Sequence, residues 1–358
     1  MEFHPLEVLI APAVAFVLAV ALIPLLSRPA SVIGLIDTPC VRKRHDKPVP
    51  LIGGLAIFLA FGASLMLVPY LPPAYGSLIF GMSLLLILGL VDDIRELSAW
   101  FRLAVQVLVA TVMVVWGGVE IRALGNLVGF GEFGLGPFAV PFTVLCTVFM
   151  INAINMADGL DGLAGGMVFI ILSMLALLGW LAGKDPGLIS VAALLAMATL
   201  GFLIYNARSP FRRRASVFMG DAGSMMLGFA IAWLAISMAG NGTSRVQPVF
   251  LAWILLIPAM DTFAISVRRL SRGRSPLAAD RTHMHHIIIR CGYPVRTAVR
   301  VLHLAVLATA LFAILAWTLG WPQAILFWMA AALFIGHTAF LLTAHLSLRW
   351  VRRWRRSA

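Results

Sequence analysis

The chain contains eleven apolar runs, each close to the length that crosses a lipid bilayer, and this pattern limits the fold to one class. About 20 apolar residues span the hydrocarbon region of a bilayer. Because lipid offers the backbone no hydrogen-bond partner, we expect every run to be helical. The runs cover residues 7–27, 51–70, 76–92, 103–118, 137–154, 163–182, 187–205, 222–239, 248–266, 299–319 and 323–346. The sequence therefore predicts an all-α, polytopic membrane protein with one integral-membrane domain over residues 1–358.

Composition excludes an ordinary soluble enzyme. Hydrophobic residues make up 61% of the 358 and charged residues 12%, with a mean hydropathy of +0.98. A soluble domain has roughly 25% charged residues, and a soluble chain this apolar could not cover its surface with polar side chains. The third and fourth runs are short, which leaves a merged or re-entrant segment as an alternative there.

Lysine and arginine predict the orientation. If the 28–50 connection faces the cytoplasm and the spans alternate, the inner segments hold 24 of the 27 basic residues. Cytoplasmic loops carry this excess in membrane proteins. We therefore expect the N-terminus outside, the C-terminus inside and the active site on the cytoplasmic face. The net charge of +12 is interpreted as contacts with the lipid bilayer and anionic substrates, without nucleic acid as a partner.

Polar residues gather at the inner ends of the runs. Asp92 and Asp93 close an apolar run in GLVDDIREL, where one could hold Mg²⁺ while the other faces the reaction. A solvated helix end is the alternative. In VFMGDAGSMMLG, Asp221 lies at the start of a run, where a carboxylate suits a metal and backbone N–H groups suit a phosphate. Helix capping by Asp221 is the alternative there.

A second kind of pattern occurs in NAINMADGLDGLAGG. Asn152, Asn155, Asp158 and Asp161 follow one another at intervals of three residues, which places them along one helical face. The glycines among them break the helix or permit close approach of a ligand to the backbone. This arrangement favours a ligand site, with a structural polar seam between helices as the alternative.

Histidines cluster in the most basic loop. Arg281, His283, His285 and His286 lie within DRTHMHHIIIR, and beside Mg²⁺-type carboxylates they favour binding of a diphosphate. Zinc is the alternative, but the H-E-x-x-H pattern and a Cys pair are both absent from the sequence. In the basic loop from residue 42 to 47, His45 and Lys47 could contact a lipid phosphate or the diphosphate. A positive-inside anchor is the other interpretation of this loop.

Taken in order, the four motifs resemble those of the polyprenyl-phosphate N-acetylhexosamine-1-phosphate transferases. The motifs are D-D, N-x-x-N-x-x-D-G-x-D-G-L, F-M-G-D-x-G-S and H-x-H-H, and the resemblance extends over nearly the whole chain. GLIDTP and DRTHMHH place the chain nearer the WecA-like branch than the muramoyl-pentapeptide branch.

The resemblance implies a reaction and a location. A sugar 1-phosphate, with GlcNAc as the commonest sugar, moves from a UDP-N-acetylhexosamine to undecaprenyl phosphate, and UMP is released. Mg²⁺ is the expected cofactor, with Mn²⁺ as a substitute. The expected location is the bacterial inner membrane, where the product starts O-antigen, teichoic acid or a related glycan. The protein could also form a homodimer, and the sequence leaves this question open.

The resemblance also implies roles for individual residues. Asp92 and Asp93 match the catalytic pair, and Asp221, with Asp92, the metal site. The remaining matches bind nucleotide or sugar: Asn152, Asn155, Asp158, Gly159, Leu160, Asp161, Asn206, Phe218, Arg281, His283, His285 and His286.

Two other functions compete with this one. A transporter also uses carboxylates within the membrane and broken helices, but the polar groups here cluster at one side and no inverted repeat is apparent. A CDP-alcohol phosphotransferase is also a Mg²⁺ membrane enzyme, but its D-G-x-x-A-R pattern is missing from this sequence.

Overall fold

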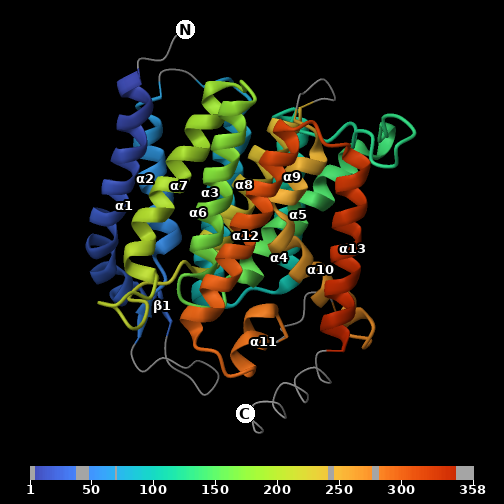
Figure 1. Ribbon diagram of the computed structural model, residues 1–358. Coiled ribbons are helices and arrows are strands. Elements are labelled where there is room, and N and C mark those ends of the chain that lie inside the picture. The colour runs from blue at the N-terminus through green and yellow to red at the C-terminus, as the bar shows by residue number, and fades with distance from the viewer. Residues whose placement is uncertain (1–4, 38–47, 69–70, 241–245, 276–281, 344–358) are drawn as a thin grey trace.

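The computed structural model describes residues 5–37, 48–68, 71–240, 246–275 and 282–343, and these residues form an all-helical bundle (Figure 1). The helices are α1 Pro5–Ile33, α2 Gly53–Leu65, α3 Tyr75–Arg95, α4 Ala99–Val115, α5 Ala139–Ala157, α6 Leu163–Leu181, α7 Pro186–Asn206, α8 Gly220–Ala239, α9 Pro248–Ile254, α10 Leu256–Leu270, α11 Met284–Arg290, α12 Val295–Thr318 and α13 Gln323–Leu342. A 3-10 turn, Gly136–Phe138, precedes α5, and two short strands, β1 Ile36–Asp37 and β2 Val49–Pro50, pair antiparallel.

Every apolar run predicted from the sequence coincides with helix, so the polytopic membrane class is confirmed. In the described part of the chain, eight helices are long and apolar enough to cross a bilayer. A ninth candidate is the pair α9 and α10, which bends by 81° at Leu255. The two further predicted runs correspond to α2 and α4, apolar helices of 13 and 17 residues. The count of eleven spans and the single domain stay predictions.

One connection agrees with the separate runs predicted from the sequence, and another differs from the prediction. The third and fourth runs form separate helices. α3 ends at Arg95, because the φ of 48° at Glu96 breaks the helix, and α4 begins after Ser98, whose side chain accepts from Phe101 N. The ninth run is not one straight helix, because α9 ends at Ile254 and α10 leaves at a steep angle. That bend directs the second half of the run toward α13.

Helix α8 lies at the centre of the bundle. All of its residues are buried except Asp221 and Ser237. Glycines permit the close approach of its neighbours: a Cβ on Gly89 of α3 would lie 2.2 Å from Cα of Ala222, and one on Gly54 of α2 would lie 2.3 Å from Cα of Gly223. Small residues bring helix backbones together in membrane bundles. The packing therefore presses α2 and α3 against the first turn of α8.

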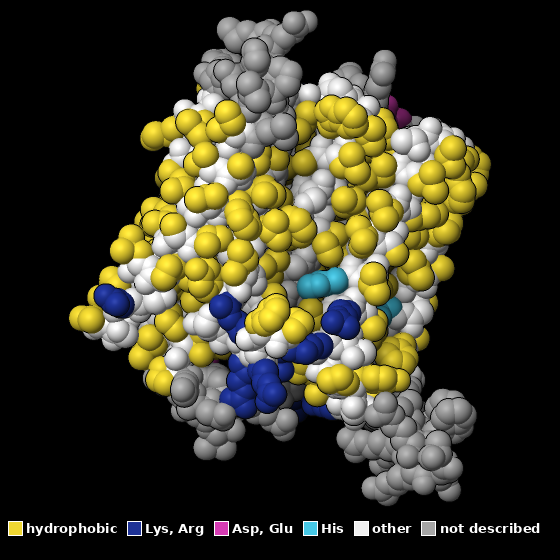
Figure 2. Space-filling view, turned by 60° about the vertical axis from the view of Figure 1, so that its left-hand side comes forward, with side chains coloured by type: hydrophobic (Ala, Val, Ile, Leu, Met, Phe, Trp, Pro, Cys, Tyr) yellow, Lys and Arg dark blue, Asp and Glu magenta, His cyan; other side chains and the backbone are white. Residues whose placement is uncertain are grey.

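The polar motifs meet at one end of the bundle. The β1–β2 pair, the start of α8 and the helix α11 all lie at this end, which is the lower end in Figure 1. Basic side chains gather at the same end (Figure 2). The backbone joins the segments there, because Phe218 N donates to Pro50 O at 2.9 Å and Gly53 N donates to Phe218 O at 2.9 Å. The fold thus gathers segments that are far apart in the sequence around one polar cavity.

Candidate active site

A cavity of about 1930 Å³ opens at this end of the molecule. Ten of the residues singled out from the sequence line it: Asp92, Asp93, Asp158, Gly159, Leu160, Asp161, Asn206, Phe218, Asp221 and His286. Four arginines line it as well: Arg102, Arg208, Arg214 and Arg290. Carboxylates and guanidinium groups therefore share one cavity, together with apolar residues such as Leu51 and Ile289.

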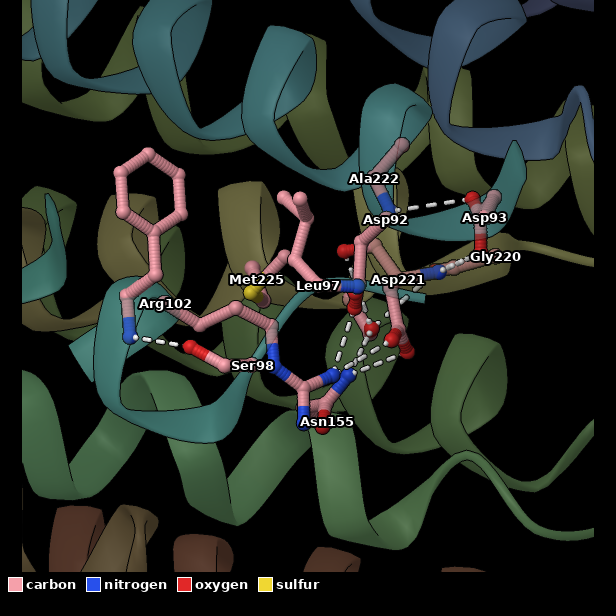
Figure 3. A network of polar contacts seen from close by, with 12 residues as sticks. Asp92, Asp93, Leu97, Ser98, Arg102, Asn155, Gly220, Asp221, Ala222 and Met225 are labelled. Atoms are coloured by element: carbon pink, nitrogen blue, oxygen red, sulfur yellow. Dashed lines mark hydrogen bonds and ion pairs between the residues drawn. The ribbon is translucent and has the colours of Figure 1, made fainter. Parts of the chain in front are cut away.

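Arg102 joins two of the predicted aspartates (Figure 3). One nitrogen of its guanidinium, Nη1, lies 2.5 Å from Oδ2 of Asp92 and 3.1 Å from Oδ2 of Asp221. Oδ1 of Asp92 accepts from Leu97 N at 2.6 Å, and Oδ1 of Asp221 accepts from Asn155 Nδ2 at 2.7 Å. The Asp92 side chain is 4% exposed and that of Asp221 is 35% exposed. Asp221 is thus the more accessible carboxylate of the two.

Asp93 points to a different partner from Asp92, as expected of neighbours on a helix. Its carboxylate accepts from the backbone N–H of Asp221 at 3.0 Å and of Ala222 at 3.4 Å, so Asp93 caps α8 (Figure 3). Gly220 makes this possible, because its φ is +74° and a Cβ there would lie 2.4 Å from Asp93 Oδ2. The first N–H groups of a helix need such partners. The capping considered for Asp221 is thus supplied by Asp93 from another helix.

The segment after α5 is held by Asn206, at the end of α7, and by contacts with the α7–α8 connection. Asn206 Oδ1 accepts from Gly162 N, and Asn206 Nδ2 donates to Val217 O, both at 2.8 Å. Asp161 Oδ2 accepts from Arg208 Nε at 2.7 Å and from Ala215 N at 3.2 Å. Asn206 and Asp161 therefore fix the loop that presents Gly159 and Leu160 to the cavity.

Asp158 ends α5 in an environment rich in negative charge. Burial raises the pKa of Asp158 to about 7, and the carboxylates of Asp221, Asp93 and Asp161 add to that rise. A carboxyl group with this pKa exchanges its proton near neutral pH. The site thus holds an acidic group whose charge depends on which cations are nearby.

The three histidines have different surroundings. His286 lines the cavity, whereas His283 and His285 are 5% and 3% exposed. Nδ1 of His283 lies 2.9 Å from Oδ2 of Asp261. The His285 ring packs on Gly159, where a Cβ would lie 2.6 Å from its Nε2. Burial, together with the rings of His286 and His283, lowers the pKa of His285 to about 3. His285 is therefore neutral at physiological pH.

The other predicted residues lie apart from the cavity or outside the described residues. Asn152 donates to Gln106 Oε1 at 2.7 Å and to Val148 O at 2.8 Å, which places it between α4 and α5. Asn155 reaches the site through Asp221. The predictions for His45, Lys47 and Arg281 fall on residues that the structure does not describe.

Sequence reasoning missed the four cavity arginines and Asp261. Arg102 had a signal, because a lone arginine in the first turn of an apolar helix is costly unless it is paired. Asp261 gave the same signal within the run 248–266. Their partners lie on other helices, so the sequence did not show what each of them contacts.

Two carboxylates of the cavity, Asp92 and Asp221, are of the kind that can hold a magnesium ion. In the described ranges, no three His, Cys, Asp or Glu side chains form a cluster that could hold a metal. Mg²⁺ is commonly held by one or two carboxylates, with phosphates and water completing its coordination. Asp221 and Asp92 supply two such carboxylates, close enough to share one nitrogen of Arg102.

Comparison with known proteins relates this site to a family. The sequence pattern of glycosyl transferase family 4 matches residues 75–239. The undecaprenyl-phosphate alpha-N-acetylglucosaminyl 1-phosphate transferase of Escherichia coli O157:H7 is 35% identical over 309 residues, which are 85% of this chain and 84% of that protein. The chain belongs to this family of transferases.

Relatives from other bacteria are similar over comparable lengths. The transferase of the same name from Yersinia pestis is 34% identical over 91% of this chain and 88% of its own length. A probable undecaprenyl-phosphate N-acetylglucosaminyl 1-phosphate transferase from Bacillus subtilis strain 168 is 33% identical over 85% of this chain and 83% of its own length. The expected family is thus confirmed, and the matched segment 75–239 supplies most of the residues that line the cavity, among them Asp92, Asp158 and Asp221.

Proposed function

We propose that this transferase moves a sugar 1-phosphate from a UDP-sugar to undecaprenyl phosphate and releases UMP. The observation that carries the proposal is the similarity, over 85% or more of the chain, to relatives named for transfer of N-acetylglucosamine 1-phosphate to this lipid. Those names also favour UDP-GlcNAc as the donor. The cavity suits the reaction, because it combines acidic and basic groups at one end of a membrane bundle.

Charge repulsion is the main obstacle to this reaction. The acceptor is an anionic phosphate monoester and the donor carries a diphosphate. Arg102, Arg208, Arg214 and Arg290 place positive charge along the cavity wall. Guanidinium groups form strong, directional bonds to phosphate oxygens. We assign these arginines, with His286, to the diphosphate and to the acceptor phosphate.

Direct attack by the acceptor is the simpler chemical route. An oxygen of the lipid phosphate forms a bond to the phosphorus that bears the sugar, and the bond from that phosphorus to the oxygen of UMP breaks. The carboxylate oxygens of Asp92 already accept from Arg102 and Leu97, and those of Asp93 from the start of α8. With these contacts, Asp92 and Asp93 are suited to holding the other parts of the site in place. Asp158, with a pKa raised to about 7, is placed to take a residual proton from the acceptor.

Mg²⁺ is the cofactor that we propose, with Mn²⁺ as a substitute. Asp221 would hold it, with Asp92 beside it. When bound, the ion would supply positive charge that offsets the charge developing on the leaving UMP. Asn155 orients the Asp221 carboxylate through the bond from its Nδ2.

The segment 158–161 and Phe218 are proposed to receive the nucleotide. Gly159, Leu160 and Phe218 all line the cavity. Asn206 and Asp161 hold this segment in place. His283 and His285 act from behind the wall, since both are buried.

The direct test is a donor panel with purified protein. Given undecaprenyl phosphate, Mg²⁺ and UDP-GlcNAc, the protein should release UMP and yield a lipid whose mass corresponds to addition of GlcNAc 1-phosphate. UDP-GalNAc and other UDP-N-acetylhexosamines identify the preferred sugar. Activity with CDP-alcohols alone, or solute flux without UMP, would instead support one of the competing functions.

Orientation belongs to the same proposal. We propose that the protein crosses the bacterial inner membrane eleven times, with the cavity facing the cytoplasm. We also propose that the product starts O-antigen or a related envelope glycan. The charge distribution supports this, since basic residues gather at the cavity end (Figure 2). Reporter fusions should place the N-terminus outside and the C-terminus inside. Termini on a common side would require an even number of spans.

A further inference from the structure

A carboxylate behind the cavity organises the histidine motif. Asp261 lies on α10, and its side chain is 18% exposed. Oδ2 lies 2.9 Å from His283 Nδ1, and Oδ1 accepts from Met284 N at 3.0 Å. His337 of α13 places its Nε2 3.6 Å from Oδ1, and its side chain is 7% exposed. Asp261 does not line the cavity, so it has no part in the chemistry proposed above.

The contact with His283 selects one form of that ring. An ionised carboxylate only accepts hydrogen bonds, so Nδ1 of His283 must carry the hydrogen. The bond made by one ring nitrogen sets the protonation of the other. Asp261 therefore determines both the orientation of the His283 ring and its tautomer.

The contact with Met284 anchors the helix that follows. Met284 begins α11, and its N–H is one of the first groups in that helix, which have no carbonyl partner within it. A helix of seven residues has little stability without outside contacts. Asp261 thus holds α11 at its start, through one side chain and one backbone group.

The position of α11 decides which histidine reaches the cavity. The His283 and His285 rings stack with centroids 5.5 Å apart and planes 11° apart, and His285 packs on Gly159. His286, Ile289 and Arg290 on the same helix line the cavity. A rotation of α11 would remove all three from the wall together.

We propose that Asp261 is a positioning residue for the transfer reaction: by holding His283 and the start of α11, it keeps His286 and Arg290 facing the donor diphosphate. This inference rests on the proposed function. It assigns the buried His283 to support of α11 and leaves contact with the donor to His286.

The test is a double-mutant cycle on donor kinetics. Asp261→Asn should lower kcat/KM for the UDP-sugar roughly tenfold, the effect of losing one charge-assisted hydrogen bond, and should leave KM for undecaprenyl phosphate unchanged. In a His286→Ala, Arg290→Ala background the same change should have almost no further effect. The proposal would be overturned if Asp261→Asn lowered kcat/KM by the same factor in the His286→Ala, Arg290→Ala background as in wild type. An equal rise in KM for the UDP-sugar and for undecaprenyl phosphate would also overturn it. Asp185→Asn is the matched control, because Asp185 accepts from Tyr75 Oη at 2.7 Å at the opposite end of the bundle.

A second measurement does not depend on activity. In protein with Cys40, Cys146 and Cys291 replaced by Ser, His286→Cys should react with a charged thiol reagent that enters the cavity. Adding Asp261→Asn should lower that rate, because α11 would no longer hold position 286 toward the cavity, whereas Asp185→Asn should leave the rate unchanged. An unchanged rate in the Asp261 variant would overturn the proposal. If wild-type protein releases no UMP from any donor, the proposed function fails while the labelling result still decides the role of Asp261.

Discussion

Asp92 on α3 and Asp221 on α8 contact the same guanidinium nitrogen of Arg102, at 2.5 Å and 3.1 Å. Two like charges held this close repel one another unless a cation lies between them. Arg102 supplies that charge from the first turn of α4. The two carboxylates, one from α3 and one from α8, are therefore held together by a residue from a third helix.

Replacing Arg102 with Met should lower the rate of transfer roughly 10- to 150-fold, because two carboxylates lose a shared charge-assisted hydrogen bond. Arg102→Lys should be intermediate, since an ammonium keeps the charge without the planar donor geometry. UMP release measures both. Arg122→Met is the control, because Arg122 pairs with Glu120 at the other end and its side chain is 57% exposed. Normal transfer by the Met variant would exclude Arg102 from the site.

Asp221→Asn should remove most activity while the protein stays folded. The amide keeps an oxygen that can accept from Asn155, but it loses the negative charge that we propose binds Mg²⁺. The variant should therefore need more Mg²⁺ for half-maximal UMP release, and its Mn²⁺ affinity by titration should fall. Wild-type turnover at limiting Mg²⁺ would reduce Asp221 to a structural role.

Gly54→Ala should destabilise the protein, because the new methyl group would lie 2.3 Å from the backbone of Gly223. Overpacking of this kind costs about 1–3 kcal/mol. Thermal unfolding in detergent should show a lower Tm, together with reduced transfer as the start of α8 shifts. Gly62→Ala on the same helix is the control, since no atom lies within 4 Å of a Cβ there. Equal Tm values for the two variants would show that α2 does not press on α8.

Asp158 should make stability depend on pH. Its folded pKa is raised to about 7, above the ordinary value for aspartate, by burial and by nearby carboxylates. The folded state therefore holds this proton more tightly than the unfolded state. Stability should fall as pH rises from about 4 to 7 and then level off with respect to this group. Asp158→Asn should reduce that slope in Tm measured with EDTA present, and a slope identical to wild type would contradict the assignment.

Much of the fold could be predicted from the sequence because membrane spans are a local property. The length of a span and its burial in lipid can be inferred from an apolar run alone. For the run 163–182, α6 extends from Leu163 to Leu181. The motifs could also be recognised from the sequence, because each one is a short stretch of neighbouring residues. Asp92, Asp158 and Asp221 were therefore identified as candidates for one site. The 81° bend after α9 was not predicted. Pro258 was its sequence signal, because proline has no N–H to donate to the carbonyl of Ile254, the last residue of α9.

The sequence by itself thus determined the helical membrane class, the candidate acidic residues and the end of the bundle where they gather. Tertiary structure decided what each one does: Asp93 caps α8, Asp92 and Asp221 share Arg102, and Asp261 holds His283. The physical reason is that hydropathy and periodicity depend on neighbours within a few turns of helix. A hydrogen bond between two helices depends instead on which faces pack together, and glycines such as Gly89 and Gly220 set that packing through contacts with residues far away in the chain.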